Sequence, residues 1–435
     1  MRKAPTATSG ISRRSLLRAS AVGAAGLAFG TRRAVGITPA SYVPRPNPAQ
    51  DVLRIAATPL NPDGKAEVAG ITADGTIPGP LIRACEGDLL RVRVENHLTD
   101  APTTIHWHGL LVPAGMDGVP DISNAPIAPG HVFVYEFPLR QSGTYWYHSH
   151  VGFQDLVGLF GPLVIDDRAA PLAAHDEVVM LSDWLHRSPA QVFAALRGEG
   201  TSAPTMKPMG DMKAMGGMKG ADLSDVKYDA FLLNGKSTAA PWTYAAPVGA
   251  PIRLRLINAA GSTYFNVRLD GHPLRITHAD GLAVEPLEVD HLLMGMAECY
   301  DAEVTLSAPG SYTLHAVAQD GSGQAVGVLH TPDVAATANL TMPTFDGRAL
   351  SYAALRAAAP TTLSAGPVRA FALPLQARVR ARASARARGA NAVTPRTGTP
   401  APCPPPGGRR CGSGRTSSRG CRRGTRSAPS RRGRR

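Results

Sequence analysis

Two pairs of histidines carry the clearest chemical signal in this 435-residue sequence. His106 and His108 form one His-x-His motif, and His148 and His150 form a second one 42 residues later. Both motifs lie in stretches with the alternation of β-strands, where side chains at i and i+2 point to the same face. Each motif therefore presents two imidazoles side by side, and imidazole suits copper, zinc, iron and nickel. The pattern predicts a polynuclear copper site, or half of one.

A methionine-rich segment is the second group of candidate metal ligands. Residues 206–218 contain five methionines at every third position, namely Met206, Met209, Met212, Met215 and Met218. Thioether sulfur is soft and suits Cu(I). The alternative is the core stripe of a helix, but Pro208 and three glycines within the segment disfavour a helix. The pattern favours an exposed loop that binds copper weakly and flexibly.

The elements that position the histidines are predicted to be short strands. Apolar and charged residues alternate over 90–95, and aromatic residues alternate with valines over 131–137. Over 143–150 the same alternation places Trp146 on the face that carries both histidines. Turn signals such as Pro129-Gly130 separate these strands. Strands of this length and spacing predict a β-sandwich that ends near residue 167.

A second β-sandwich is predicted after the first. Ile252, Leu254 and Leu256 alternate with arginines, as in a half-buried strand. Asp270-Gly271 separates two strand-like stretches and predicts a hairpin turn, and Pro309-Gly310 predicts another in the same way.

The N-terminus has the pattern of an export signal. Arg13 and Arg14 stand before Leu16-Leu17 and a weakly apolar stretch from Ala19 to Gly30. This pattern is typical of bacterial twin-arginine (Tat) signals, and the alternative is an ordinary basic N-terminus. The apolar stretch is too short for a membrane span. We expect a signal peptide over 1–40, the Tat export machinery as a partner and a periplasmic location.

The C-terminal segment differs in composition from everything before it. Residues 376–435 hold 17 Arg, no acidic residue, and no Leu, Ile, Met, Phe, Tyr or Trp, so we expect disorder. The formal charge of +13 belongs to this segment, because the remaining residues have a net charge of −4. One hypothesis is a frameshift that replaced a third domain. The other is a genuine basic tail for anionic polymers, which the lack of lysine and aromatic residues disfavours. We therefore expect no nucleic-acid partner.

The chain resembles multicopper oxidases, and most of all the periplasmic copper-resistance (CopA-type) members. The resemblance covers roughly residues 45–375 and rests on several motifs in the family's order. These motifs are His106-Trp107-His108-Gly109, Met116–Pro120, Pro126–Gly130, Ser142–Trp146, Tyr147-His148-Ser149-His150, Leu232–Gly235, Arg253–Asn258 and Glu298–Asp301.

The resemblance implies cupredoxin domains and specific roles for the histidines. The family's trinuclear copper cluster lies between its first and third domains. His106 would bind the type 2 copper, and His108, His148 and His150 the two type 3 coppers. Asp117 would lie beside the cluster and help deliver protons as dioxygen is reduced to water, which suits a fixed carboxylate. The alternative for Asp117 is a turn residue before Gly118.

The chain departs from the family in one large respect. The third-domain motifs that supply the type 1 copper site and half of the trinuclear ligands do not occur, and no histidine follows His330. By family the chain would be a copper-dependent oxidoreductase, which oxidises Cu(I) or phenolic donors and reduces dioxygen to water. We expect this chain alone to be inactive. The alternatives are a periplasmic copper-sequestering protein without turnover, or a non-functional truncated product.

Together these observations predict an all-β fold of two cupredoxin-like Greek-key β-sandwich domains. The expected segments are a Tat signal peptide over 1–40, a first cupredoxin domain over 45–168, a second over 175–335 with the methionine loop 206–218, a linker and start of a lost third domain over 336–375, and a disordered Arg-rich tail over 376–435.

Overall fold

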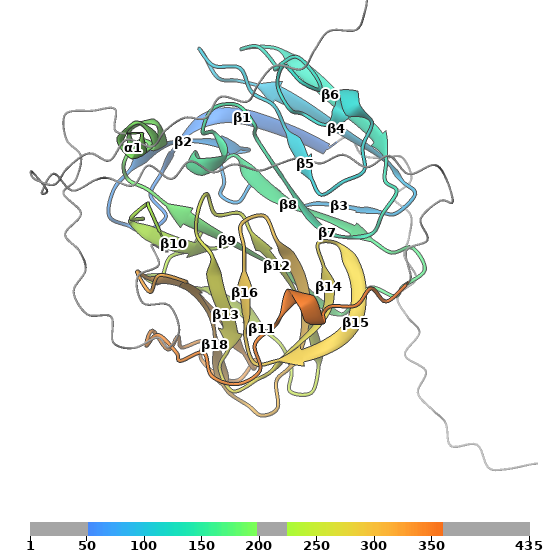
Figure 1. Cartoon of the computed structure of the whole chain (residues 1–435), viewed down its shortest axis with the longest axis vertical. Helices are drawn as coiled ribbons and strands as arrows, with labels where there is room; N and C mark the ends of the chain where they lie inside the picture. Colours follow the sequence, from blue (N-terminus) through green and yellow to red (C-terminus); the bar gives the residue numbers. More distant parts are fainter. Residues whose placement is uncertain (1–50, 198–223, 360–435) are drawn as a thin grey trace, which may run out of the picture. The chain divides into compact units, whose positions relative to one another are not determined.

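The computed structural model describes residues 51–197 and 224–359, which form two β-sandwiches (Figure 1). The predicted all-β fold is confirmed, because within these residues the α-helices are limited to the eight residues of α1 (Pro189–Leu196). No helix in the described ranges is long and apolar enough to span a bilayer. The predicted signal peptide, methionine loop and Arg-rich tail lie outside the described residues.

The first sandwich packs two four-stranded sheets against each other. One sheet has the order β2-β1-β4-β6, with strands β1 (Asp51–Leu60), β2 (Val68–Ala73), β4 (Leu89–Asn96) and β6 (Val132–Pro138). The other has the order β3-β8-β7-β5, with strands β3 (Ile82–Cys85), β5 (His106–His108), β7 (Gly143–His148) and β8 (Phe160–Asp166). Two short 3-10 turns, η1 (Ala114–Met116) and η2 (Asp155–Val157), follow β5 and β7.

Alternation along the strands determines which side chains form the core of the first sandwich. In β4 the residues Leu90, Val92 and Val94 are buried, while the arginines between them face outward, as the sequence predicted. In β6, Tyr135 and Phe137 are buried in the same core. Both strands are thus half-buried, with one face toward the other sheet and one toward solvent.

Strand β7 is buried on both of its faces. Tyr145 and Tyr147 point into the core of the first sandwich. Trp146 points the other way and packs with Met180 and Ile257 of the second sandwich. The strand that carries His148 is therefore held between two cores, so its position depends on both sandwiches.

The second sandwich has eleven strands in two sheets. The six-stranded sheet has the order β10-β9-β12-β17-β14-β15, with strands β9 (His175–Trp184), β10 (Ala230–Leu233), β12 (Pro251–Asn258), β14 (Leu274–Ala279), β15 (Leu282–Val289) and β17 (Cys299–Thr305). The five-stranded sheet has the order β11-β19-β18-β13-β16, with strands β11 (Trp242–Ala245), β13 (Phe265–Leu269), β16 (Leu292–Met294), β18 (Ser311–Ala318) and β19 (Gln324–His330).

The two hairpins predicted in this sandwich are wrong. Asp270-Gly271 does form a tight turn, with Leu269 bridged to His272, but β13 and β14 on either side of it belong to different sheets. Pro309-Gly310 likewise joins β17 of one sheet to β18 of the other. The dipeptides specify a sharp reversal of the chain, and they do not specify that the next strand pairs with the previous one.

A network of buried charges joins the two sandwiches. Arg255, only 2% exposed, donates through Nε and Nη2 to the carboxylate of Asp176 at 2.6 and 2.9 Å, and through Nη1 to Thr144 Oγ1 at 2.9 Å. Arg83 of the first sandwich donates to Asp176 at 2.7 Å and to Asp166 at 2.8 Å. Each buried charge thus has an opposite partner, as burial requires.

The segment after β19 runs along the second sandwich. Its backbone bridges to β15 at Val284 and Ala357, and Arg348 pairs with Glu288 at 2.8 Å and Asp290 at 3.0 Å (orange in Figure 1). The turn η3 (Tyr352–Ala354) lies within this segment.

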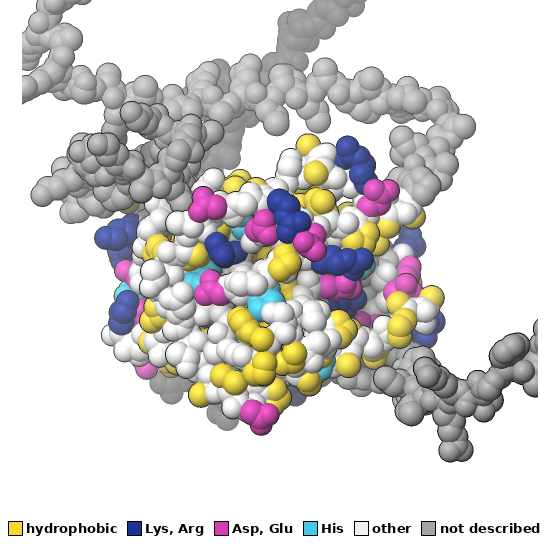
Figure 2. Space-filling view, turned by 90° about the horizontal axis from the view of Figure 1, so that it is seen from below, with side chains coloured by type: hydrophobic (Ala, Val, Ile, Leu, Met, Phe, Trp, Pro, Cys, Tyr) yellow, Lys and Arg dark blue, Asp and Glu magenta, His cyan; other side chains and the backbone are white. Residues whose placement is uncertain are grey.

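Figure 2 shows one face of the molecule, on which acidic and basic side chains are interspersed with apolar ones. Opposite charges also pair on the second sandwich, as Arg275 does with Glu303. The described part of this face therefore presents mixed charge rather than an extended basic patch.

Candidate metal centre

Strands β5 and β7 bring the predicted site histidines together at one edge of a sheet. The two strands pair antiparallel, so that His106 lies opposite His148 and His108 lies opposite Trp146. Alternation sends these four side chains to one face, while Trp107 enters the core on the opposite face. His150 follows two residues after the end of β7.

The four imidazole rings converge. The centroid of the His106 ring lies 4.6 Å from that of His150, 5.5 Å from that of His148 and 5.7 Å from that of His108. One candidate ligand atom from each of His106, His108 and His148 lies within 4.8 Å of the other two. Among the described residues, no other group of three His, Cys, Asp or Glu side chains converges in this way.

The loop after β5 fixes the orientation of His106. Its Nδ1 lies 2.7 Å from the carbonyl oxygen of Asp117. A carbonyl can only accept, so Nδ1 carries the proton and Nε2 keeps a free lone pair. Gly118 permits this approach, because its φ is 77° and a Cβ there would lie 1.8 Å from the carbonyl oxygen of Ile105. The Asp117 carboxylate is also close, with Oδ1 3.5 Å from the same Nδ1.

The geometry of His108 and His148 suits a shared metal ion. His108 Nδ1 lies 3.3 Å from His148 Nε2. Metal–nitrogen bonds of about 2.0–2.1 Å, as zinc makes to histidine, place two ligands of a tetrahedral ion roughly 3.3–3.4 Å apart. The two nitrogens are thus close enough that one ion could bind to both. The imidazole donor set fits copper.

Trp146 connects these two histidines to the second sandwich. Its ring stacks on His148, with centroids 4.2 Å apart and planes at 14°, and on His108, at 5.0 Å and 25°. The Trp146 ring also packs with Phe160, Met180 and other apolar residues. Stacking keeps each imidazole plane within 25° of the indole plane, while the two imidazole planes are tilted by 38° to each other.

Burial and the neighbouring imidazoles keep His108, His148 and His150 neutral. Burial first, and then the neighbouring imidazoles, lower the pKa of His148 to about 2 and that of His108 to about 4. The same causes lower the pKa of His150. At neutral pH these rings are uncharged, and a neutral imidazole is the form that binds a metal.

The turn after His150 contains two residues that the sequence analysis missed. Gln154, 5% exposed, accepts from Thr103 Oγ1 and Ser149 Oγ at 2.8 Å each and donates to the carbonyl of Pro102 at 2.8 Å. It thereby ties the chain before β5 to the turn after β7. Asp155 places its Oδ2 3.9 Å from His148 Nδ1. Neither residue belongs to a spacing that signals metal binding, so only the fold reveals them.

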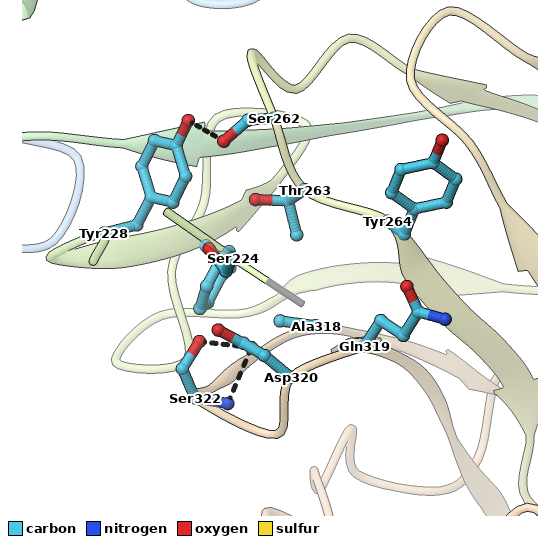
Figure 3. A pocket seen from close by; sticks show the side chains of 10 residues that line it. Ser224, Tyr228, Ser262, Thr263, Tyr264, Ala318, Gln319, Asp320 and Ser322 are labelled. Atoms are coloured by element: carbon cyan, nitrogen blue, oxygen red, sulfur yellow. Dashed lines mark hydrogen bonds between the residues drawn. The ribbon is translucent and has the colours of Figure 1, made fainter. Parts of the chain in front are cut away.

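Among the hollows of the described residues that lie away from the histidines, two are a cleft between the sandwiches and a small pocket in the second sandwich. A cleft of about 410 Å³ opens between the sandwiches, but its most buried charges pair with each other, as Arg255 does with Asp176 and Arg253 with Asp301. A hollow of about 10 Å³ in the second sandwich is lined by hydroxyl groups, including Tyr228 (Figure 3). That volume holds about one water molecule. Neither hollow contains a converging set of metal ligands.

Comparison with known proteins points to one family. A family model described as multicopper oxidase matches residues 54–170, and a second model with the same description matches residues 175–334. The chain is 42% identical over 302 residues to the Copper resistance protein A homolog of Pseudomonas syringae pv. tomato, covering 64% of this chain and 50% of that protein. It is 36% identical over 322 residues to Copper resistance protein A of Escherichia coli, covering 68% of this chain and 52% of that protein.

Solved structures agree in fold. The crystal structure of Blue Copper Oxidase from Nitrosomonas europaea is similar with a TM-score of 0.53 and 28% identity, covering 65% of this chain and 85% of that one. The chain spans about half the length of the curated relatives it matches.

Proposed function

The chain belongs to the multicopper oxidase family, and from this premise we propose that His106, His108, His148 and His150 bind copper. The observation that carries the proposal is the convergence of the rings, with ligand atoms of three of them within 4.8 Å of one another. Bound copper would supply one-electron redox chemistry.

The chain's own groups prepare the site before any ion arrives. The Asp117 carbonyl holds the His106 proton on Nδ1 and leaves Nε2 to bind. The Asp117 carboxylate, 3.5 Å from that Nδ1, is the group placed to hold or pass on a proton. Burial of His108 and His148 keeps both rings neutral without competition from protons.

The reaction of the intact family is proposed for the site only in combination with further ligands. That reaction is the oxidation of Cu(I) or of phenolic donors coupled to the reduction of dioxygen to water. We propose that this chain alone does not turn over, because its sequence has no histidine after His330 and no cysteine beside a histidine. Its described histidines supply no type 1 site through which electrons would enter.

A role in copper resistance in the periplasm is the proposed context. It is supported by the likeness to two copper resistance proteins and by the twin arginines Arg13 and Arg14, which suit export by the Tat pathway.

Copper sequestration without turnover is the second candidate function. It is favoured by the five methionines of 206–218, whose thioethers suit Cu(I) and which lie outside the described residues. In that case copper would be held by the methionine loop as well as by the histidines.

A copper titration of the full chain tests both functions. The apo chain is titrated with Cu(I) against a chromophoric chelator, and oxygen uptake is followed with a phenolic donor. We expect His106→Gln with His148→Gln to weaken binding at the site at least ten-fold, because two converging donors are lost. His131→Gln, at an exposed histidine just before β6 of the other sheet, is the matched control and should bind like the parent.

The outcomes separate the proposals. Equal binding by the double variant and the parent would overturn copper binding at the histidines. Loss of binding only when the five methionines become leucine would favour sequestration by the loop. Sustained oxygen uptake and a blue colour from the parent chain would overturn the proposed lack of turnover.

A further inference from the structure

One ring nitrogen of His148 is buried without a hydrogen-bond partner. The residue is 8% exposed, and its Nδ1 makes no hydrogen bond with the described residues. Its other nitrogen, Nε2, faces His108 Nδ1 at 3.3 Å, on the side where the imidazoles converge. A buried polar atom of this kind is costly unless a partner reaches it in some state of the protein.

The nearest charged group to this nitrogen is the carboxylate of Asp155. Its Oδ2 lies 3.9 Å from His148 Nδ1, about 1 Å beyond an ordinary hydrogen bond. Its Oδ1 accepts from the backbone N–H of Leu156 at 2.9 Å. One oxygen is thus used within the turn, and the other remains directed toward the histidine.

The turn that carries Asp155 is held in place by its neighbours. Gln154 fixes it to the chain before β5 through hydrogen bonds with Pro102 and Thr103. At the end of the turn, Gly158 has a φ of 120°, and a Cβ there would lie 2.7 Å from Ile77 Cγ2. The carboxylate therefore sits on a supported turn rather than on a free surface loop.

We propose that Asp155 is a positioning residue that orients His148 for metal binding, an inference that rests on the proposed function of the site. In the metal-binding state the two groups would close by about 1 Å from their present 3.9 Å, so that Nδ1–H of His148 donates a hydrogen bond to the carboxylate. This keeps the proton on Nδ1, directs the Nε2 lone pair toward the converging imidazoles and increases the basicity of that nitrogen. Histidines that bind metals usually donate their second ring nitrogen to a carboxylate or carbonyl in this way.

The substitution Asp155→Asn distinguishes this role from a structural one. The amide oxygen of asparagine can still accept from the Leu156 N–H, so the turn is kept. The amide nitrogen then faces His148 Nδ1 and can only donate, which favours the tautomer with the proton on Nε2. Asp100→Asn, at an exposed acid of the same sandwich, is the matched control.

The experiment measures three quantities on the full chain at neutral pH. They are the Cu(I) affinity by chelator competition, the tautomer of His148 by nitrogen–proton NMR correlation, and the melting temperature of the apo protein. For Asp155→Asn we expect a loss of affinity of about 10–100-fold, a shift of the proton from Nδ1 to Nε2, and the melting temperature of the control.

Each result bears on the inference separately from the proposed function. Parent-like affinity in Asp155→Asn would overturn the inference while leaving copper binding intact. An unchanged tautomer with a lowered melting temperature would also overturn it, since that is the signature of a structural residue. If the parent chain binds no copper, the proposed function fails, and the tautomer of the apo protein still decides whether Asp155 orients His148.

Discussion

The individual histidines of the site remain able to bind a metal, but they make the folded protein less stable at low pH. His148 is buried and His108 is half-buried beside other histidines, and these surroundings lower their pKa to about 2 and about 4, from an ordinary value of 6.5. Protonating them in the folded state is unfavourable, whereas the unfolded chain binds these protons freely. The rings therefore stay available as ligands at the expense of acid stability.

The apo protein should lose stability as the pH falls below about 6.5. Between that pH and the lowered pKa values the unfolded chain binds more protons, so the free energy of unfolding decreases with decreasing pH. Above pH 6.5 both histidines are neutral in the folded and the unfolded chain, so their protonation no longer reduces the free energy of unfolding. Denaturant unfolding at pH 7.5 and pH 5 measures the difference. His148→Gln should reduce it and His131→Gln should not; an equal pH dependence in all three proteins would contradict the assignment.

At the scale of elements, the long loop between β5 and β6, residues 109–131, supports the site through one glycine. Gly118 lets the Asp117 carbonyl approach His106, and a side chain at this position would meet the main chain of Ile105. The loop thus orients a proposed ligand without supplying one itself.

Gly118→Ala should therefore destabilise the first sandwich and weaken metal binding. The left-handed backbone alone costs a non-glycine residue about 1–3 kcal/mol, and the contact at 1.8 Å adds to this. Gly115→Ala, three residues earlier in the loop, has nothing within 4 Å of its Cβ and is the control. Thermal melting and copper affinity measure both effects. Matching values for the two variants would show that the loop adapts without strain.

At the scale of elements, the sequence predicts the faces of individual strands but not which strands pair. Alternation correctly assigned the faces of β4 and β6 and placed Trp146 on the histidine face of β7. The turn signal at Asp270-Gly271 predicted a hairpin wrongly, because turn chemistry describes four residues and the choice of sheet depends on distant strands. Asp155 escaped notice for a similar reason, since its relation to His148 exists only after η2 folds against the site.

At the scale of the whole described molecule, the two sandwiches depend on each other. The indole that stacks on the histidines is buried by residues of the second sandwich, and Arg255 crosses the same boundary to Thr144. A substitution that disrupts the contacts between the sandwiches should therefore weaken the metal centre even when no proposed ligand is changed.

Arg255→Ala should destabilise the chain by up to about 3–5 kcal/mol, the cost of breaking a buried ion pair, because the carboxylate of Asp176 then keeps only its pairing with Arg83. Arg91→Ala removes an exposed ion pair with Glu136 and should cost about 1 kcal/mol or less. Denaturant unfolding measures both, and calorimetry reports whether the sandwiches of Arg255→Ala melt in separate transitions. Similar costs for the two variants would mean that the boundary charges do not couple the sandwiches.

The stacking of Trp146 on His148 has an optical consequence. An indole in contact with two imidazoles lies within a few ångströms of any ion they hold, and an excited indole readily passes its energy or an electron to copper. The chain carries four tryptophans, and Trp107 points from the same strand pair into the opposite core. The fluorescence of Trp146 should therefore decrease as copper occupies the centre, and it reports the occupancy without an added dye.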